Sequence, residues 1–225
     1  MTGTVYLGCG SAEDEADLWH LMLHRPVTRI IYWPFALPAT MLASADDWLR
    51  ANLDRLGAPY ELTTWTRLED QAPRGLEDGH LLFVGGGNTF RLLDQVRRAG
   101  LVDPVRRFVD EGGDYYGGSA GAVLACTDIA IAEGHDPNEP GLVDLTALGL
   151  LRNVAILPHF TEEQVPSGQE WATAKRRTLI GLPENAGLHV ARNSYEVVGT
   201  GSVYVMDEIG TDSHSGGSTF GPFED

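Results

Sequence analysis

Short apolar runs alternate along this chain with longer segments in which apolar residues recur every three or four positions. The runs predict buried strands over 4–7, 28–33, 60–65 and 80–84. The longer segments predict helices over 13–24, 41–56, 88–100 and 103–111, with Gly57 as a stop signal and Asn88 as a cap. Strands that alternate with helices in this way are typical of βαβ units and of a mainly parallel sheet covered on both faces.

The alternation of predicted strands and helices is less regular in the second half of the chain. Residues 113–116 lead into a glycine-rich stretch and a further helix, and 133–145 predict an irregular loop. We expect a strand over 154–157, a helix over 170–180 and successive short antiparallel strands over 187–207. The polar, Gly- and Ser-rich residues from about 210 to 225 predict a tail with mobile ends. Since neither a linker nor a repeat interrupts the pattern, we predict one domain over residues 1–225.

Composition and charge narrow the classes of function. The chain has 225 residues, 43% of them hydrophobic, and a formal net charge of −16, which argues against nucleic acid and acidic lipid as partners. The N-terminal residues lack the basic start and apolar stretch of a signal peptide, and no apolar stretch is long enough to span a membrane, so we expect a cytoplasmic protein. Cys9 and Cys126, the two cysteines, are expected to be reduced structural thiols, and the histidine spacing indicates no metal site.

The stretch 115-YYGGSAGAVLAC-126 sets one serine among very small residues. Its G-x-S-x-G pattern is that of a nucleophile on a sharp strand-to-helix turn, where only small neighbours fit beside Ser119. The start of the following helix would offer backbone N–H groups to a developing oxyanion. A glycine-rich turn without a catalytic role, or one that binds phosphate, would explain the same sequence motif.

Two further stretches carry candidate chemistry. In 83-FVGGGNTFRLL-93 three glycines follow a strand and precede a helix, where ligands bind in open α/β sheets. This stretch fails the G-x-G-x-x-G dinucleotide pattern because Phe90 stands where the last glycine is required. In 154-VAILPHF-160, His159 closes an apolar strand, so it is either a general base beside the serine or an ordinary histidine at a strand end.

Together these stretches resemble the peptidase E family of aspartyl dipeptidases. The matching signatures are GGGNTF at 85–90, GGSAGA at 117–122 and PHF at 158–160, in that order. The resemblance implies a three-layer αβα sandwich with a mainly parallel sheet, similar to class I glutamine amidotransferase domains. It also implies a serine peptidase that needs no metal or organic cofactor and acts on short peptides.

The resemblance assigns roles residue by residue. Ser119 would be the nucleophile, His159 the general base and Glu184, in 181-GLPE-184, the residue that orients the histidine. The backbone N–H groups of Gly87 and Ala120 would form the oxyanion hole. Substrate contacts would involve the following residues: Asn88, Thr89 and Asp136. Glu196, Asp144 and Asp136 remain rivals of Glu184 as the third member of the triad.

The sequence departs from the family pattern in one region, and this difference affects the expected substrate specificity. Aspartyl dipeptidases use a basic residue after the histidine loop to recognise the substrate aspartate, whereas residues 161–175 are rich in glutamate and contain no arginine. We therefore expect a serine exopeptidase or dipeptidase that is not restricted to N-terminal aspartate. The alternatives are a cyanophycinase-like hydrolase and a non-catalytic amidotransferase-like binding module. The antiparallel strands near 197–206 could also pair between subunits in a homo-oligomer.

Overall fold

The computed structural model of the protein describes residues 2–68 and 73–223. Five parallel strands form the central part of the larger sheet: β1 (Val5–Gly8), β2 (Thr28–Trp33), β3 (Tyr60–Thr64), β4 (Leu81–Val84) and β5 (Asp114–Gly118). Three antiparallel strands extend this sheet beyond β1, namely β8 (Ala186–Ala191), β9 (Ser194–Gly199) and β12 (Thr219–Phe220). The strand order is β12-β9-β8-β1-β5-β4-β2-β3, so β1 and β5 lie at its centre.

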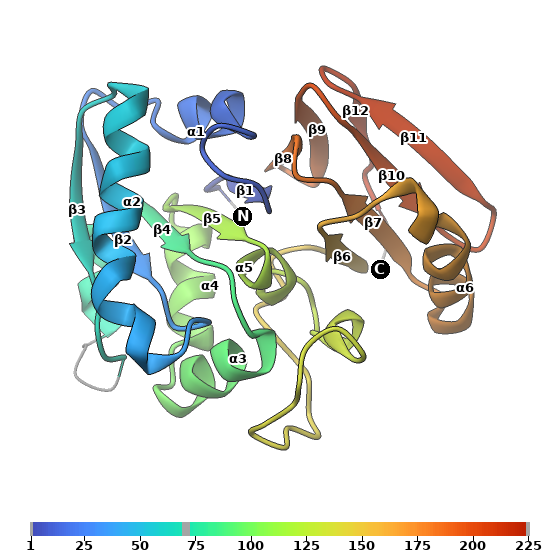
Figure 1. Ribbon diagram of the computed structural model, residues 1–225, viewed down its shortest axis with the longest axis horizontal. Coiled ribbons are helices and arrows are strands. Elements are labelled where there is room, and N and C mark those ends of the chain that lie inside the picture. Colours follow the sequence, from blue (N-terminus) through green and yellow to red (C-terminus); the bar gives the residue numbers. More distant parts are fainter. Residues whose placement is uncertain (1, 69–72, 224–225) are drawn as a thin grey trace.

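A second, smaller sheet lies beside the first. It contains β6 (Val154–Pro158), β7 (Thr178–Leu182), β10 (Ser202–Met206) and β11 (Thr211–Ser215) in the order β11-β10-β7-β6. The chain enters it through a long loop after α5 (Ala120–Leu124), crosses to the larger sheet for β8 and β9, and comes back for β10 and β11. Figure 1 shows this sheet in the right half of the molecule, with helix α6 (Val165–Lys175) at the outer edge.

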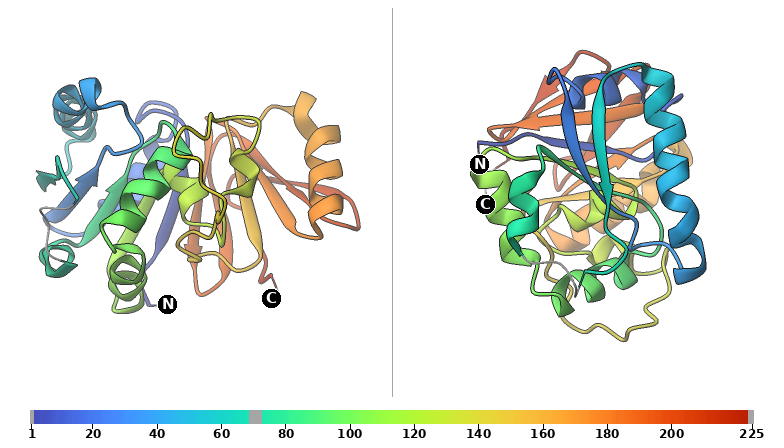
Figure 2. Two further views of the ribbon diagram at one scale, coloured as in Figure 1. Left: turned by 90° about the horizontal axis from the view of Figure 1, so that it is seen from below. Right: turned by 90° about the vertical axis from the view of Figure 1, so that its left-hand side faces the viewer.

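Helices cover both faces of the parallel strands. On one face lie α1 (Ala16–Met22) and α2 (Leu42–Leu56), and on the other lie α3 (Thr89–Arg98), α4 (Val102–Asp110) and α5 (Ala120–Leu124). Single turns of 3₁₀ helix occur at Ala39–Met41, Ala130–Ala132 and Glu162–Gln164, and a longer one at Pro73–Asp78. Figure 2 shows the strands between these helical layers. The arrangement is the predicted αβα sandwich with a mainly parallel sheet.

The two faces bury two separate apolar cores because side chains alternate along each strand. On the β4 strand Leu81 and Phe83 face α1 and α2, whereas Leu82 and Val84 face α3 and α5. All four side chains are almost completely buried. The second core continues without a break into the smaller sheet through Ile156 and Ile180, so both sheets share one hydrophobic interior.

Two predicted helices have the wrong bounds. The predicted helix over 170–180 begins earlier, at Val165, and ends where Arg176 adopts a φ of +51°. Residues 178–182 form the buried strand β7 instead, because every side chain of that run faces the interior. Helix α1 also starts later than predicted, because the Ser11 hydroxyl bonds the Asp14 carboxylate in a turn at 2.6 Å.

In the described residues up to 223, the tail for which we predict mobile ends contains two strands. Residues 211–215 pair with β10 and residues 219–220 pair with β9, although most of their side chains face solvent. Strand pairing needs only backbone groups. The polar side chains of these two strands therefore gave no apolar pattern from which to predict them. They also cover the strands near 197–206, which we predicted as a free edge for subunit pairing. Residues 224–225 lie outside the described part.

No helix in the described ranges is long and apolar enough to cross a membrane.

Candidate active site

Ser119 sits at the turn between β5 and α5. Its φ of +51° and ψ of −107° are unusual for a residue with a side chain, and its N–H donates to the Gly8 carbonyl oxygen at 2.8 Å. The turn is tight because α5 starts directly against β4. A Cβ atom at Gly121 would lie 2.3 Å from the Val84 carbonyl oxygen, so only glycine fits there. This is the strand–turn–helix context that a G-x-S-x-G nucleophile requires.

Three side chains from distant parts of the chain form one hydrogen-bonded line. The Nε2 atom of His159 lies 2.9 Å from Ser119 Oγ, and its Nδ1 atom lies 2.9 Å from Glu184 Oε1. Ser119 follows β5 of the larger sheet, whereas His159 follows β6 and Glu184 follows β7 of the smaller sheet. The histidine and glutamate side chains are 48% and 62% exposed, so this end of the line is in contact with water.

The rival acidic residues are bound elsewhere. Glu196 pairs with His189 at 2.9 Å, and Asp144 pairs with Arg97 at 3.1 Å. Asp136 accepts a hydrogen bond from the Thr89 backbone N–H at 2.7 Å. Of the candidates for a third triad member, Glu184 is therefore the one whose carboxylate reaches His159.

Cys9, at the end of β1, fixes the backbone of the histidine. Its sulfur accepts a hydrogen bond from the His159 N–H at 3.3 Å and donates to the Leu182 carbonyl oxygen at 3.2 Å. His159 itself has a φ of +56°, a conformation that needs such support. The sequence pointed to Cys9 only as a buried thiol and did not predict this positioning role.

The thiols provide a test of this packing. Burial raises the pKa of Cys9 and of Cys126 to about 12, so neither side chain is expected to be a thiolate near neutral pH. We expect the native protein to remain unmodified by a thiol-specific disulfide reagent at pH 8, while the denatured protein reacts at both cysteines. Rapid reaction of Cys9 without denaturant would show that the end of β1 is open to solvent.

The glycine loop between β4 and α3 lies against Ser119. A Cβ atom at Gly86 would come within 3.1 Å of the Ser119 Cβ, and Gly87 has a φ of +136° with the Ala36 carbonyl oxygen 2.4 Å from its Cβ position. Ala120 is the first residue of α5, and the first N–H groups of a helix have no partner within it. The glycine loop and the start of α5 thus lie on either side of the serine, and donation by the Gly87 and Ala120 N–H groups stays a prediction.

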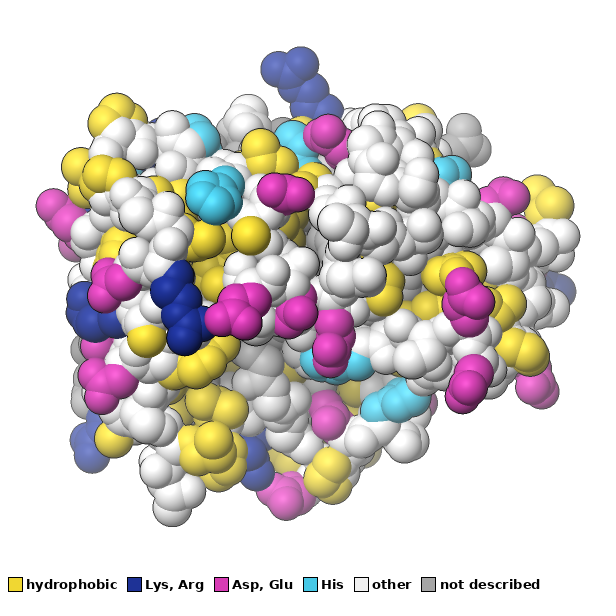
Figure 3. Space-filling model, turned by 45° about the horizontal axis from the view of Figure 1, so that its top comes forward, with side chains coloured by type: hydrophobic (Ala, Val, Ile, Leu, Met, Phe, Trp, Pro, Cys, Tyr) yellow, Lys and Arg dark blue, Asp and Glu magenta, His cyan; other side chains and the backbone are white. Residues whose placement is uncertain are grey.

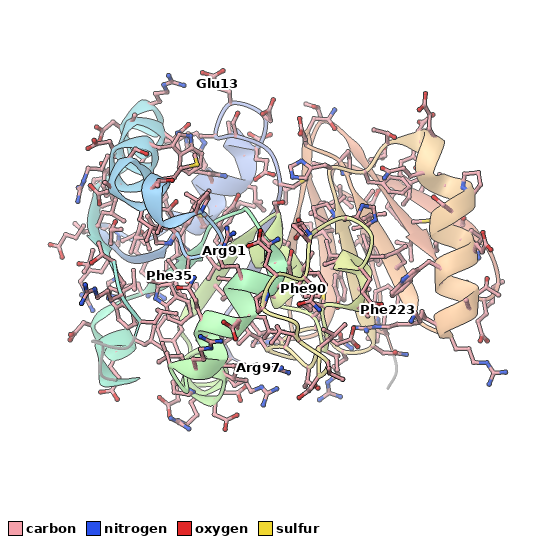
Figure 4. All side chains as sticks on the ribbon, turned by 60° about the horizontal axis from the view of Figure 1, so that its bottom comes forward. Glu13, Phe35, Phe90, Arg91, Arg97 and Phe223 are labelled. Carbon is pink, nitrogen blue, oxygen red and sulfur yellow. The ribbon has the colours of Figure 1, made fainter. Side chains whose placement is uncertain are left out.

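The three predicted substrate-binding residues hold this loop in place. Asn88 caps α3 by accepting from the Arg91 N–H at 2.8 Å, and its amide donates to the Pro137 carbonyl oxygen at 2.9 Å. The Asp136 carboxylate binds the helix start at Thr89, as described above, and the Thr89 side chain is buried. Figure 4 shows Arg91 and Arg97 along the same helix, which the loop after β5 follows. Direct contact of these three residues with substrate stays a prediction.

Beneath the site lies a buried carboxylate that the sequence did not identify. Glu15 is 1% exposed and accepts hydrogen bonds from the backbone N–H groups of Cys9 and Gly10, from the Tyr116 hydroxyl at 2.9 Å and from the Trp19 indole at 3.3 Å. Burial raises the pKa of Glu15, and these hydrogen bonds oppose the shift. The only signal in the sequence was an acidic residue shortly after Gly8-Cys9-Gly10, which is too common a pattern to indicate such a role.

A cavity of about 570 Å³ opens beside Ser119, between the ends of the parallel strands and α2. Its volume is in the range of small-molecule sites in proteins. Besides Ser119, His159 and the glycine loop, it is lined mainly by large apolar and aromatic side chains: Tyr32, Leu37, Met41, Trp48, Phe83 and Tyr116.

Comparison of the sequence with known proteins finds similar peptidases. Residues 8–198 match the model of peptidase family S51. The chain is 36% identical to peptidase E of Citrobacter koseri over 146 residues, which are 59% of this chain and 61% of that protein. It is 36% identical to peptidase E of Escherichia coli O1:K1 over 145 residues, 58% of this chain and 60% of that protein. The chain thus spans about three fifths of the length of these curated relatives.

Two solved structures share the fold. A candidate peptidase E from Listeria monocytogenes EGD-e superposes with a TM-score of 0.71 at 19% identity, covering 88% of this chain and 99% of its own. A peptidase from an acI-B1 Actinobacterium superposes with a TM-score of 0.71 at 22% identity, covering 98% of this chain and 97% of its own. These similarities confirm the predicted α/β fold.

Proposed function

Because the chain belongs to peptidase family S51, we propose that it is a serine exopeptidase that hydrolyses short peptides through an acyl-enzyme. The proposal assigns Ser119 as nucleophile, His159 as general base and Glu184 as the carboxylate that orients the imidazole. The observation that carries it is the pair of 2.9 Å contacts on either side of the His159 ring. In this proposal, residues 1–225 act as one catalytic domain, since the nucleophile and the base come from different sheets.

The contacts define a direction of proton transfer. With Nδ1–H donating to Glu184, the Nε2 atom of His159 is free to accept the Ser119 proton as the hydroxyl attacks the scissile carbonyl. His159 then gives that proton to the leaving amine, and water hydrolyses the acyl-enzyme by the same route in reverse. Glu184 is exposed, so it acts mainly by fixing the tautomer and orientation of the ring.

The oxyanion of the tetrahedral intermediate needs fixed donors. We assign the backbone N–H groups of Gly87, in the glycine loop, and of Ala120, at the start of α5, which lie on either side of Ser119. Asn88 and Asp136 support these donors indirectly, because they tie the glycine loop to α3 and to the loop after β5.

A peptide screen tests the proposal. We expect the full-length protein to release amino acids from a library of dipeptides and tripeptides, and the Ser119→Ala variant to lose this activity by about 10⁴-fold or more. A fluorophosphonate should label the wild-type protein at Ser119 and leave the variant unlabelled. Equal activity of the two proteins, or a folded wild type that is not labelled, would contradict the assignment; the second result would favour a binding module without turnover.

A further inference from the structure

The cavity beside Ser119 carries no charged side chain to match an aspartate. None of its described lining residues is Asp, Glu, Lys or Arg. Two arginines on flanking helices are already engaged. Arg50 on α2 binds Asp46 at 2.6 Å, and Arg91 on α3 binds Glu139 at 2.9 Å. A substrate carboxylate that entered the cavity would lose its hydration without gaining an ion pair.

The cavity walls instead suit a large apolar side chain. Tyr32, Phe83 and Tyr116 are less than 3% exposed and contribute aromatic surface at its base. Their rings are fixed by packing, since Phe83 stacks on Tyr116 at 4.2 Å and meets Tyr32 edge to face at 5.5 Å. Such a rigid wall favours ligands with a flat or branched apolar group.

The mouth of the cavity is also apolar. Met41 is 48% exposed and Trp48 is 46% exposed, and both line the cavity from the α2 side. Hydrophobic side chains reach the surface over the half of the molecule that contains α2 (Figure 3). Exposed apolar side chains at the rim of a concave site are typical of a ligand-binding surface.

The position of His159 fixes which part of a substrate reaches this cavity. Strand β5 lies between β1 and β4, and His159 approaches Ser119 from the β1 side, where Cys9 holds its backbone. The cavity, which Cys9 and His159 line at that end, continues the other way over β4 and β2, toward Phe83 and Tyr32. The leaving amine must lie next to His159 to receive its proton, so the acyl part of the substrate points toward the cavity.

We propose that this cavity binds the side chain of the residue on the acyl side of the scissile bond and selects large apolar residues, such as phenylalanine, tyrosine, leucine or methionine, over aspartate. The inference rests on the proposed function, because it takes Ser119 as the nucleophile and His159 as the proton donor to the leaving amine. It adds a substrate class to that reaction.

Dipeptides that differ only in the first residue test the preference. With alanine as the second residue, we expect kcat/KM for Phe-Ala, Tyr-Ala and Leu-Ala to exceed that for Asp-Ala and Lys-Ala by about 100-fold or more. Ser119-dependent hydrolysis that is fastest for Asp-Ala, or equal for all first residues, would overturn this inference and leave the proposed function intact. Absence of Ser119-dependent hydrolysis for every peptide would overturn both.

Two variants at the cavity rim test the location of the specificity site. Trp48→Ala is expected to lower kcat/KM for Phe-Ala about 10-fold and to affect Ala-Ala less, because a small side chain cannot contact the indole. Leu21→Ala, which removes a 41% exposed apolar side chain on α1 outside the cavity lining, is the matched control and should change neither value. Equal effects of the two variants on Phe-Ala would place the specificity site elsewhere.

A charge placed in the cavity should change the selected class. Ser44 is exposed and lines the cavity, so Ser44→Arg puts a guanidinium where no cation now lies among the described lining residues. We expect this variant to raise kcat/KM for Asp-Ala about 10-fold and to lower it for Phe-Ala. Ser44→Met, of similar length and without charge, should leave Asp-Ala a poor substrate. A gain on Asp-Ala in both variants, or in neither, would count against the proposed cavity.

Discussion

Replacing His159 with alanine is expected to lower kcat for peptide hydrolysis by about 10⁴- to 10⁶-fold, with little change in fold stability. The imidazole is the group within hydrogen-bond distance of Ser119 Oγ, and its side chain is 48% exposed, so its removal leaves no large void in the core. The rate should be measured on the best dipeptide from the peptide screen, with circular dichroism to confirm that the variant is folded.

If Ser119 and His159 act together in one step, the effects of replacing them on the rate should not add. A double variant therefore tests the assignment further. The double variant Ser119→Ala/His159→Ala should be no more than a few-fold slower than either single variant. His189→Ala is the matched control, because His189 also holds a glutamate at 2.9 Å through Nδ1 but stacks on Tyr6 instead of facing a serine. We expect this control to keep activity within about threefold of wild type. An His159→Ala variant with more than a tenth of wild-type activity would exclude His159 as the general base.

Replacing Glu15 with alanine is expected to lower the free energy of unfolding by about 3–5 kcal/mol. The substitution removes the acceptor for four donors, of which those of Cys9, Trp19 and Tyr116 are buried and that of Gly10 is partly buried. It also opens a void between β1 and α1. Urea denaturation followed by tryptophan fluorescence measures the loss.

A nearby glutamate controls for the change in charge. Glu13 lies two residues earlier in an ion pair with Arg55 whose side chains are 74% and 62% exposed, and Glu13→Ala should alter stability by no more than about 0.5 kcal/mol. Similar losses in the two variants would contradict the anchoring role of Glu15. Burial raises the pKa of Glu15, so the native state binds this proton more tightly than the unfolded state does. The part of the stability that comes from this tighter proton binding is therefore present at low pH and is lost as pH rises through the folded-state pKa.

The sequence located the parallel half of the fold more closely than the rest. Strand β2 has the predicted bounds, and Asn88 caps α3 as expected, because these features depend on local patterns of apolar runs and turn residues. Strand β7 was taken for part of a helix, since the apolar positions 172, 179 and 180 fit a helical spacing as well as a buried strand. The strands over 211–215 and 219–220 carry polar side chains and gain order from pairing, which no local pattern records.

Some residues of the candidate site could also be predicted from the sequence, whereas others could not. Ser119 and His159 lie in short stretches whose residue types are demanded by local geometry, so the sequence indicated them. Cys9 and Glu15 act through partners up to 173 positions away, and the contacts become visible only when β1 meets the ends of β6 and β7. The cavity is assembled from separate segments of β2, α2, β4 and β5, none of which is unusual by itself.

The division of the triad between two sheets has a further consequence. Ser119 is carried by one sheet, while His159 and Glu184 are carried by the other, so the packing between the two sheets sets the distance across which the proton passes. If the proposed function holds, a small molecule bound between the two sheets would separate His159 from Ser119 and stop hydrolysis without touching the substrate cavity.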